Sequence, residues 1–272
     1  MTVDIGVALR PVPHAGRTPV SMIERMTLIL DTFDGPAPMR TLVDVVERTG
    51  LPRSSVHRII EQMIRLRWLA HAPGGYRLGT RALELGGLAI EHNEIRDVMG
   101  PLLHELCRRT GMVAHLGVLD GPEVLLIDKA VGRGGDSLPT RLGGRLPAHS
   151  TAVGKALLAI VPPSVIELAF PERLPQLTAQ TIGRRAELHR ELDQVRCHRG
   201  VAIDRAESLP DVVCVAVPIR ADVDGGVAAL SLSGRVGEQS RPGTGRLAQI
   251  LVEAADDAER AVRTHLRRRH RV

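Results

Sequence analysis

Apolar residues recur at helical spacing in three short stretches near the start of the chain. The first stretch runs from Ser21 to Phe33 and ends at Gly35-Pro36, and the second begins after Thr41 and closes at Gly50. In the third, which follows this turn, the apolar residues are Val56, Ile59, Ile60, Met63 and Ile64. Such periodicity predicts three amphipathic helices, with Gly50 adopting the left-handed conformation of a sharp turn.

The polar side of the third helix is rich in hydrogen-bond donors. Its residues are Arg53, Ser54, Ser55, His57, Arg58, Gln62 and Arg65. A helix, a tight glycine turn and a second helix with donors on its exposed N-terminal half are typical of a helix-turn-helix that enters the major groove of DNA. The alternative is that this polar face is merely solvated, as in any three-helix unit.

Two short strands are expected after the third helix. Residues 68–70 and 76–78 flank Pro73-Gly74-Gly75, which is typical of a β-ribbon with a glycine turn. Such a ribbon would be the wing of a winged helix-turn-helix, with Arg77 placed to contact DNA phosphate. Residues 40–80 carry seven arginines and three acidic residues, a net +4, which favours double-stranded DNA as the partner.

The rest of the chain alternates between helical and strand patterns. Helices are expected at residues 81–93, 96–110, 151–160, 163–169, 184–199 and 244–266. Strands are expected at residues 113–119, 124–130, 141–146, 201–204, 212–217 and 227–233. The first of these helices would be a stiff connector. The mixed order predicts an α+β domain in which helices pack against an antiparallel sheet.

Length and charge suggest how the chain is divided. Its 272 residues predict about two domains. The net charge is +3 over residues 1–80, −3 over residues 81–262 and +5 over residues 263–272. We therefore expect a disordered tail at 1–20, a DNA-binding domain at 21–80, a linker helix at 81–95, a second domain at 96–263 and a basic tail at 264–272.

Composition excludes several classes of protein. The chain is 43% hydrophobic and 25% charged, and no apolar run approaches the roughly 18 residues that a membrane-spanning helix needs. The start of the chain also lacks the apolar core of a signal peptide, so we expect a soluble, cytoplasmic protein. The cysteines Cys107, Cys197 and Cys214 form no CxxC pair, which favours reduced thiols over disulfides or a zinc site.

Motifs for catalysis are incomplete. Gly154-Lys155 lacks the first glycine and the final hydroxyl residue of a phosphate-binding loop, and residues 132–137 lack the last glycine of a dinucleotide fingerprint. His104-Glu105 lacks the second histidine of a zinc-protease helix. Cys214 could pair with a histidine as a nucleophile, but a cysteine in an apolar strand is far more often a packing residue. We expect no catalytic residue, metal or cofactor.

A small anion could bind where the helix near Ser150 begins. The first-turn N–H groups and the positive end of the helix dipole favour a carboxylate there. Asp204, Cys214, Ser231 and Ser233 lie at strand positions that could complete the site, and the two serines share a face because side chains alternate along a strand. The sequence leaves open whether these serines face a ligand or solvent.

Four motifs occur together along the chain. They are Thr-Gly-Leu-Pro-Arg-Ser-Ser-Val-His-Arg at 49–58, Tyr-Arg-Leu-Gly at 76–79, Gly-Gly-Arg-Leu-Pro-Ala-His-Ser-Thr-Ala-Val-Gly-Lys-Ala-Leu-Leu-Ala at 143–159 and Ala-Ala-Leu-Ser-Leu-Ser-Gly at 228–234. With them the chain resembles the IclR family of transcriptional regulators from about Ser21 to Val262, and the third motif is the specific one. The resemblance implies a winged helix-turn-helix, a linker helix and an effector-binding domain of GAF-like or profilin-like topology. It also implies a homodimer or a dimer of dimers on palindromic operators, and no catalysis.

The resemblance also implies particular site residues. The effector pocket would include Ala152, Val153, Asp204, Val212, Cys214, Ser231 and Ser233. From the residues themselves, on the second and third helices and in the wing, we expect the DNA contacts to come from Thr41, Arg53, Ser54, Ser55, His57, Arg58, Gln62 and Arg77. The chain departs from the family pattern at residues 205–207, where members often have a run of acidic residues, and at Val213, where an arginine commonly stands.

The amino-acid composition of the second domain limits which chemical class of small molecule could be the effector. Phe170 is the only aromatic residue beyond residue 80, which excludes an aromatic cage for a cation. A pocket of leucine, valine and a few hydroxyl groups suits a small or flexible organic acid. The sequence therefore favours a ligand-responsive DNA-binding regulator, repressor or activator. The alternative is a small-molecule sensor or enzyme on a GAF-like scaffold that uses its winged helix for protein contacts.

Overall fold

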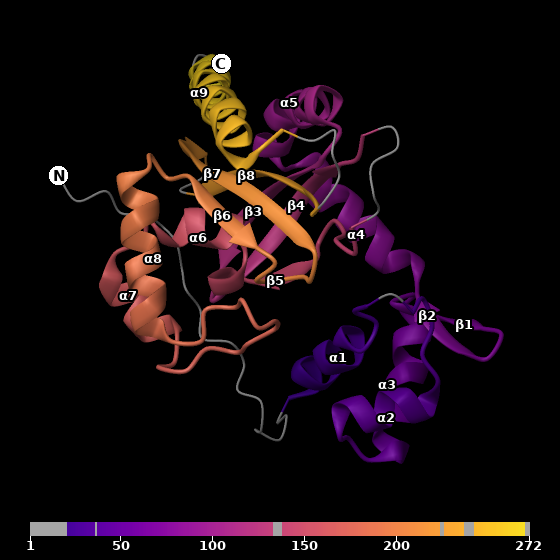
Figure 1. Cartoon of the computed structure of the whole chain (residues 1–272). Coiled ribbons are helices and arrows are strands. Elements are labelled where there is room, and N and C mark those ends of the chain that lie inside the picture. The colour runs from indigo at the N-terminus through magenta and orange to yellow at the C-terminus, as the bar shows by residue number, and fades with distance from the viewer. Residues whose placement is uncertain (1–20, 36, 133–137, 224–225, 237–241, 270–272) are drawn as a thin grey trace. The chain divides into compact units, whose positions relative to one another are not determined.

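The structure is a computed structural model that describes residues 21–35, 37–132, 138–223, 226–236 and 242–269. Contacts within the chain separate two compact units, one ending at Asn93 and the other beginning at Glu94 (Figure 1). The expected tail at 1–20 lies outside the described residues. We describe each unit by itself.

The first unit is a three-helix bundle with a β-ribbon and a further helix. Its elements are α1 (Met22–Asp31), α2 (Leu42–Thr49), α3 (Arg53–Arg65), β1 (Leu69–Ala72), β2 (Gly75–Leu78) and α4 (Thr80–Glu91). Capping boxes start α1 at Ser21 and α2 at Thr41, and Gly50 ends α2 in the left-handed conformation. The apolar stripes of α1, α2 and α3 meet in one core with Leu69 and Tyr76 of the ribbon. This is the winged helix-turn-helix that the sequence predicts.

Arg40 ties the ribbon to the helices of this unit. Its side chain is buried, and it donates from Nε to the Thr32 carbonyl at 2.6 Å and from Nη2 to the Asp34 carbonyl at 3.2 Å. Its backbone pairs with that of Tyr76 on β2 in both directions. A Cβ at Gly75 would lie 2.4 Å from the Arg40 carbonyl oxygen, so the close approach of these backbones requires glycine.

The second unit contains a six-stranded sheet and five α-helices among its described residues. The strands are β3 (Val113–Asp120), β4 (Glu123–Ala130), β5 (Arg145–Pro147), β6 (Ala202–Arg205), β7 (Val212–Val223) and β8 (Gly226–Arg235). The helices are α5 (Glu94–Thr110), α6 (Ala152–Leu158), α7 (Pro163–Ala169), α8 (Arg185–Cys197) and α9 (Thr244–Arg269), with a 3-10 turn at Ala148–Ser150. Within the described parts, no helix is both long and apolar enough to span a membrane.

Every strand pair in this sheet is antiparallel, in the order β5-β4-β3-β8-β7-β6. One face packs against α5 and α9, and the other against α6, α7 and α8 (Figure 1). Each face therefore has its own apolar core. The sequence prediction of an α+β domain with an antiparallel sheet flanked by helices is confirmed.

Several expected boundaries differ from the observed ones. The strand expected at 141–146 is confined to β5, because a turn at Gly143 and Gly144 bonds back to Leu126 and Arg141. The helix expected at 151–160 is shorter, since a 3-10 turn precedes it and Thr151 is its N-cap. At the other end α9 continues to Arg269, so most of the expected basic tail is helical, and residues 270–272 lie outside the described part.

The short helix α6 lies against the sheet so closely that all seven of its residues are buried. A Cβ at Gly154 would lie 2.1 Å from the Ala148 carbonyl oxygen and 2.3 Å from the Ala148 Cα. Backbone atoms on both sides leave no flexible side chain that could move away. Gly154 therefore permits the contact between α6 and the preceding 3-10 turn.

We predict that Gly154→Ala lowers the free energy of unfolding by roughly 2 to 4 kcal/mol, because the added methyl group displaces backbone. Urea unfolding measures this change. Gly245→Ala is the matched control: this exposed glycine lies in α9 with open space around it, so alanine should stabilise by up to about 1 kcal/mol. Equal effects of the two substitutions would contradict the packing assigned to Gly154.

Candidate nucleic-acid interface and ligand pocket

The outer face of α3 carries the donors that the sequence assigns to DNA. Arg53, Ser54, His57 and Arg58 are exposed, and Ser55 and Gln62 are half-buried. The opposite stripe is buried, as residues Val56, Ile59, Ile60 and Met63. The helix thus turns its apolar side to the core and presents a row of guanidinium, hydroxyl, imidazole and amide groups outward.

Thr41 and Arg77 lie elsewhere in the same unit. The Thr41 hydroxyl accepts from the Asp44 N–H at 3.1 Å and donates to Asp44 Oδ2 at 2.9 Å, so it already serves as the N-cap of α2. The Thr41 backbone N–H, which donates to Asp44 Oδ2 at 2.7 Å, and then the Thr41 hydroxyl lower the pKa of Asp44. Arg77 is exposed on β2, opposite Ala70 in the wing. DNA contact by these two residues stays a prediction.

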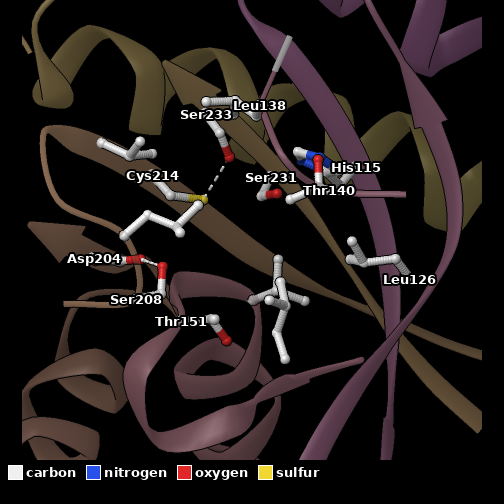
Figure 2. A pocket seen from close by; sticks show the side chains of 14 residues that line it. His115, Leu126, Leu138, Thr140, Thr151, Asp204, Ser208, Cys214, Ser231 and Ser233 are labelled. Carbon is white, nitrogen blue, oxygen red and sulfur yellow. Dashed lines mark hydrogen bonds between the residues drawn. The ribbon is translucent and has the colours of Figure 1, made fainter. Parts of the chain in front are cut away.

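A small cavity of about 40 Å³ lies between α6 and the sheet of the second unit (Figure 2). Its lining comes from all six strands of the sheet, the segment around Thr140, the start of α6 and the loop after β6. The residues are His115, Leu126, Leu138, Thr140, Leu146, Thr151, Val153, Asp204, Ser208, Leu209, Val212, Cys214, Ser231 and Ser233.

Strand register brings distant polar residues together on this face of the sheet. Ser233 on β8 pairs with Cys214 on β7, which in turn pairs with Asp204 on β6. Ser231, two residues earlier on β8, pairs with His115 on β3. Side chains of directly paired residues lie on the same face, so these five form a polar strip across four strands.

Six of the seven expected effector-binding residues line this cavity, namely Val153, Asp204, Val212, Cys214, Ser231 and Ser233. The exception is Ala152, whose role in effector binding stays a prediction: it does not line the cavity and is fully buried in the apolar core between α6 and the sheet. The cause is the phase of the helix, since the first turn directs Thr151 and Val153 toward the cavity instead. The Thr151 hydroxyl also accepts from the Gly154 N–H, so the first turn of α6 is already capped in part.

Several lining residues were missed by the sequence reasoning. The polar ones are His115, Thr140, Thr151 and Ser208, and of these only Thr151 belongs to one of the four motifs, where it was interpreted as a helix cap. His115 could have been found by alternation, since a polar residue at that position of β3 faces the same side as Val113. Thr140 and Ser208 lie outside strands and gave no periodic signal.

Burial keeps the polar groups of the cavity uncharged except near Asp204. Burial, aided by the charge of Lys129, lowers the pKa of His115 to about 4, and Nε2 of this histidine lies 2.8 Å from Thr140 Oγ1. Burial raises the pKa of Cys214 to about 12, and Ser233 Oγ donates to its sulfur at 3.0 Å. A thiol in this state is not an activated nucleophile.

Asp204 is a buried acid with two hydrogen bonds. Its oxygens accept from the Glu207 N–H at 2.7 Å and the Ser208 hydroxyl at 2.6 Å, while burial raises its pKa. Burial also raises the pKa of Glu207, opposed by the neighbouring ammonium of Lys155. Among the described residues, no group of three or more His, Cys, Asp or Glu side chains could hold a metal ion.

Lys155 is fully buried behind the cavity and organises its Asp204 side. Its ammonium donates to Glu191 Oε1 on α8 at 2.9 Å, to Glu207 Oε1 at 2.7 Å and to the Ile203 carbonyl on β6 at 2.6 Å. All three N–H groups are thereby satisfied, so Lys155 holds the cavity wall and is not free to bind a ligand.

The hydroxyl of Ser231 differs from the other polar groups of the cavity in its hydrogen bonding. It is fully buried at the cavity and has no hydrogen-bond partner among the described residues. Buried polar groups normally find a partner, so this one indicates that a ligand or water completes the site.

Comparisons with known proteins cover both units. The model of the IclR helix-turn-helix domain matches residues 22–73, and the model of the bacterial transcriptional regulator IclR C-terminal domain matches residues 87–260. The regulator XynR of Escherichia coli is 35% identical over 217 residues, which are 79% of this chain and 86% of XynR. The regulator TtgV of Pseudomonas putida is 33% identical over 198 residues, or 72% of this chain and 74% of TtgV.

Solved structures show the same fold. A crystal structure of an IclR homolog from Microbacterium hydrocarbonoxydans, complexed with 4-hydroxybenzoate, superposes with a TM-score of 0.76. It is 29% identical, and the match covers 90% of this chain and all of that chain. The IclR of Thermotoga maritima, at 26% identity, matches 89% of this chain with a TM-score of 0.67.

The depressed pKa of His115 predicts a pH dependence of stability. Its folded pKa of about 4 is below the ordinary 6.5, so the unfolded chain takes up a proton that the folded chain does not. We predict that wild type loses stability relative to His115→Gln as the pH falls from 6.5 toward about 4. Urea unfolding at several pH values measures the difference, in which the contribution of buried His149 cancels. Parallel curves for the two proteins would contradict the environment assigned to His115.

Proposed function

Because the chain belongs to the IclR family of bacterial transcriptional regulators, we propose that it binds a palindromic operator through its winged helix-turn-helix and responds to a small organic acid in its C-terminal pocket. Binding of the acid would shift the balance between arrangements of the DNA-binding units. The position of the operator relative to the promoter would decide between repression and activation. Such a protein acts in the cytoplasm, where the chromosome lies.

The exposed donor face of α3 carries the DNA-binding part of this proposal. Arg53, Arg58 and Gln62 stand on a helix that follows a tight turn, as in helices that read base edges in the major groove. Arginine binds guanine through two parallel hydrogen bonds, which makes Arg53 and Arg58 the best candidates for sequence recognition. Arg77 in the wing is suited to a phosphate contact.

The cavity of the second unit supports the ligand-binding part. Its lining combines leucine and valine side chains with hydroxyl groups, and the buried Ser231 hydroxyl lacks a partner. An IclR homolog of the same fold has been crystallised with 4-hydroxybenzoate, a small organic acid. The alternative of an enzyme loses support, because the relatives are transcriptional regulators and Cys214 is not activated.

Helix α4 supports self-association as a homodimer or a dimer of dimers. None of its residues is buried, and Leu83 is 77% and Leu88 49% exposed. Leu83, Gly86, Gly87 and Ile90 recur at helical spacing, so they form one apolar face with small residues that let a second helix approach closely. We propose that this face packs against the same face of a second copy.

The roles of the arginines predict different losses of DNA affinity. Arg58→Ala should weaken operator binding by about 1 to 3 kcal/mol and leave binding to random DNA nearly unchanged, because it removes base contacts. Arg77→Ala should weaken binding to both DNAs alike and reduce the salt dependence, because it removes a phosphate contact. Fluorescence anisotropy with operator and random DNA at several salt concentrations measures these affinities and their salt dependence.

Arg190→Ala, an exposed arginine of α8 in the second unit, controls for the loss of one positive charge. It should leave both affinities as in wild type. Equal losses on operator and random DNA for Arg58→Ala would contradict its assignment to a base. No salt-dependent affinity of the wild-type chain for any DNA would contradict the proposed function itself.

The apolar face of α4 predicts a change of oligomeric state. Leu83→Glu should dissociate the dimer and weaken operator binding at least tenfold, because a charge would be buried in the interface and the two half-sites would bind independently. Leu168→Glu is the matched control, since Leu168 is 90% exposed on α7 in the other unit. Sedimentation velocity measures whether each variant is a monomer or a dimer. An unchanged dimer in Leu83→Glu would show that α4 is not the interface.

A further inference from the structure

The two ends of the cavity differ in charge. On the sheet face toward α6, His115 of β3 pairs with Lys129 of β4 at one end, and Asp204 lies on β6 at the other. Strands β8 and β7 separate the two ends. Figure 2 shows His115 with Thr140 on one side of the cavity and Asp204 with Ser208 on the opposite side.

The His115 end is positive because of Lys129. The ammonium of Lys129 donates to the Thr140 carbonyl at 2.6 Å and to the Leu138 carbonyl at 3.2 Å, and both of these residues line the cavity. Among the described residues this ammonium has no carboxylate partner, and its third N–H is not used by either carbonyl. Its charge is therefore not neutralised locally, and it acts on the cavity through Thr140 and His115.

Uncharged donors at this end can bind an anion directly. Thr140 Oγ1 lies 2.8 Å from His115 Nε2, so the hydroxyl can accept from the imidazole and still donate its own hydrogen into the cavity. The unpartnered Ser231 hydroxyl lies next to His115 across the β3–β8 pair. A carboxylate placed here would meet two hydroxyl donors in the field of an ammonium.

The Asp204 end is negative. Lys155 is its only ammonium among the described contacts, and it is shared by the carboxylates of Glu191 and Glu207. With Asp204 this makes one cation against three acids. None of the residues that line the cavity is a lysine or an arginine. A second carboxylate would be repelled at this end, whereas a hydroxyl group could donate to Asp204.

We propose that the pocket binds a small hydroxy acid in one orientation, with its carboxylate accepting from the Thr140 and Ser231 hydroxyls beside His115 and its hydroxyl donating to Asp204. The inference rests on the proposed function, in which the ligand is an acid, and adds the class and the direction of binding. His115, Thr140 and Lys129 thereby become determinants of specificity for the carboxylate. Asp204 becomes the determinant for the hydroxyl.

Calorimetric titration of the full-length chain with matched probes tests this. The probes are 4-hydroxybenzoate and 4-hydroxybutanoate, each compared with the parent acid, the O-methyl ether and the corresponding amide. In at least one series the hydroxy acid should bind tenfold or more tightly than each of the other three. The parent acid and the ether lack the donor for Asp204, and the amide lacks the charge that Lys129 attracts.

Two substitutions test which end of the cavity binds the carboxylate and which binds the hydroxyl. Lys129→Met should bring acid and amide to within about threefold of each other and keep the preference for hydroxyl over methyl ether. Asp204→Asn should remove the preference for hydroxyl over methyl ether and keep the preference for acid over amide. The reason is that an amide side chain can donate a hydrogen bond to the ether oxygen, whereas a carboxylate cannot. Arg190→Ala should retain both preferences. If Asp204→Asn does not fold, the wild-type series and Lys129→Met still decide the matter.

The outcomes separate this inference from the proposed function. Acids that bind wild type equally well with and without the hydroxyl would overturn the inference and leave the acid-responsive regulator standing. Exchanged effects of the two substitutions would overturn the orientation. A pocket that binds none of the acids would overturn both the inference and the proposed acid effector.

Discussion

The buried ammonium of Lys155 is the interaction on which the ligand-binding unit depends. It lies on α6 with no exposed surface and joins α8, β6 and the loop after β6 through three hydrogen bonds. A buried charge is stable only when its partners are all in place, so these elements hold one another in register. Glu207 in turn fixes Asp204 in the cavity wall, because the Glu207 N–H donates to Asp204 Oδ1.

The sheet brings together residues that are far apart in the chain. Antiparallel pairing of β3, β8, β7 and β6 brings His115, Ser231, Cys214 and Asp204 onto one face, although they are spread between positions 115 and 231 of the chain. DNA recognition is assigned to the separate unit that ends with α4.

Local features of the fold could be predicted from sequence, whereas long-range ones could not. The three helices of the winged unit, the turn at Gly50 and the outward face of α3 follow from periodicity and caps within about 15 residues. The resemblance to a family supplied six pocket residues. Ala152 does not line the cavity, because the orientation of a side chain in the first turn depends on one residue of helix phase. His115 and Thr140 were missed because their meeting depends on strand register and on the segment after β4.

We propose above all that this chain is an operator-binding protein whose DNA affinity is set by an acid in the cavity. Quantitative footprinting of the full-length protein on the DNA that flanks its own gene, with and without an acid that raises its melting temperature, tests this most directly. We expect one protected palindrome with half-sites about one to one and a half helical turns apart, and a shift of at least tenfold in the protein concentration for half-protection when the acid is present. Protection that is absent, or that the bound acid does not change, would contradict it.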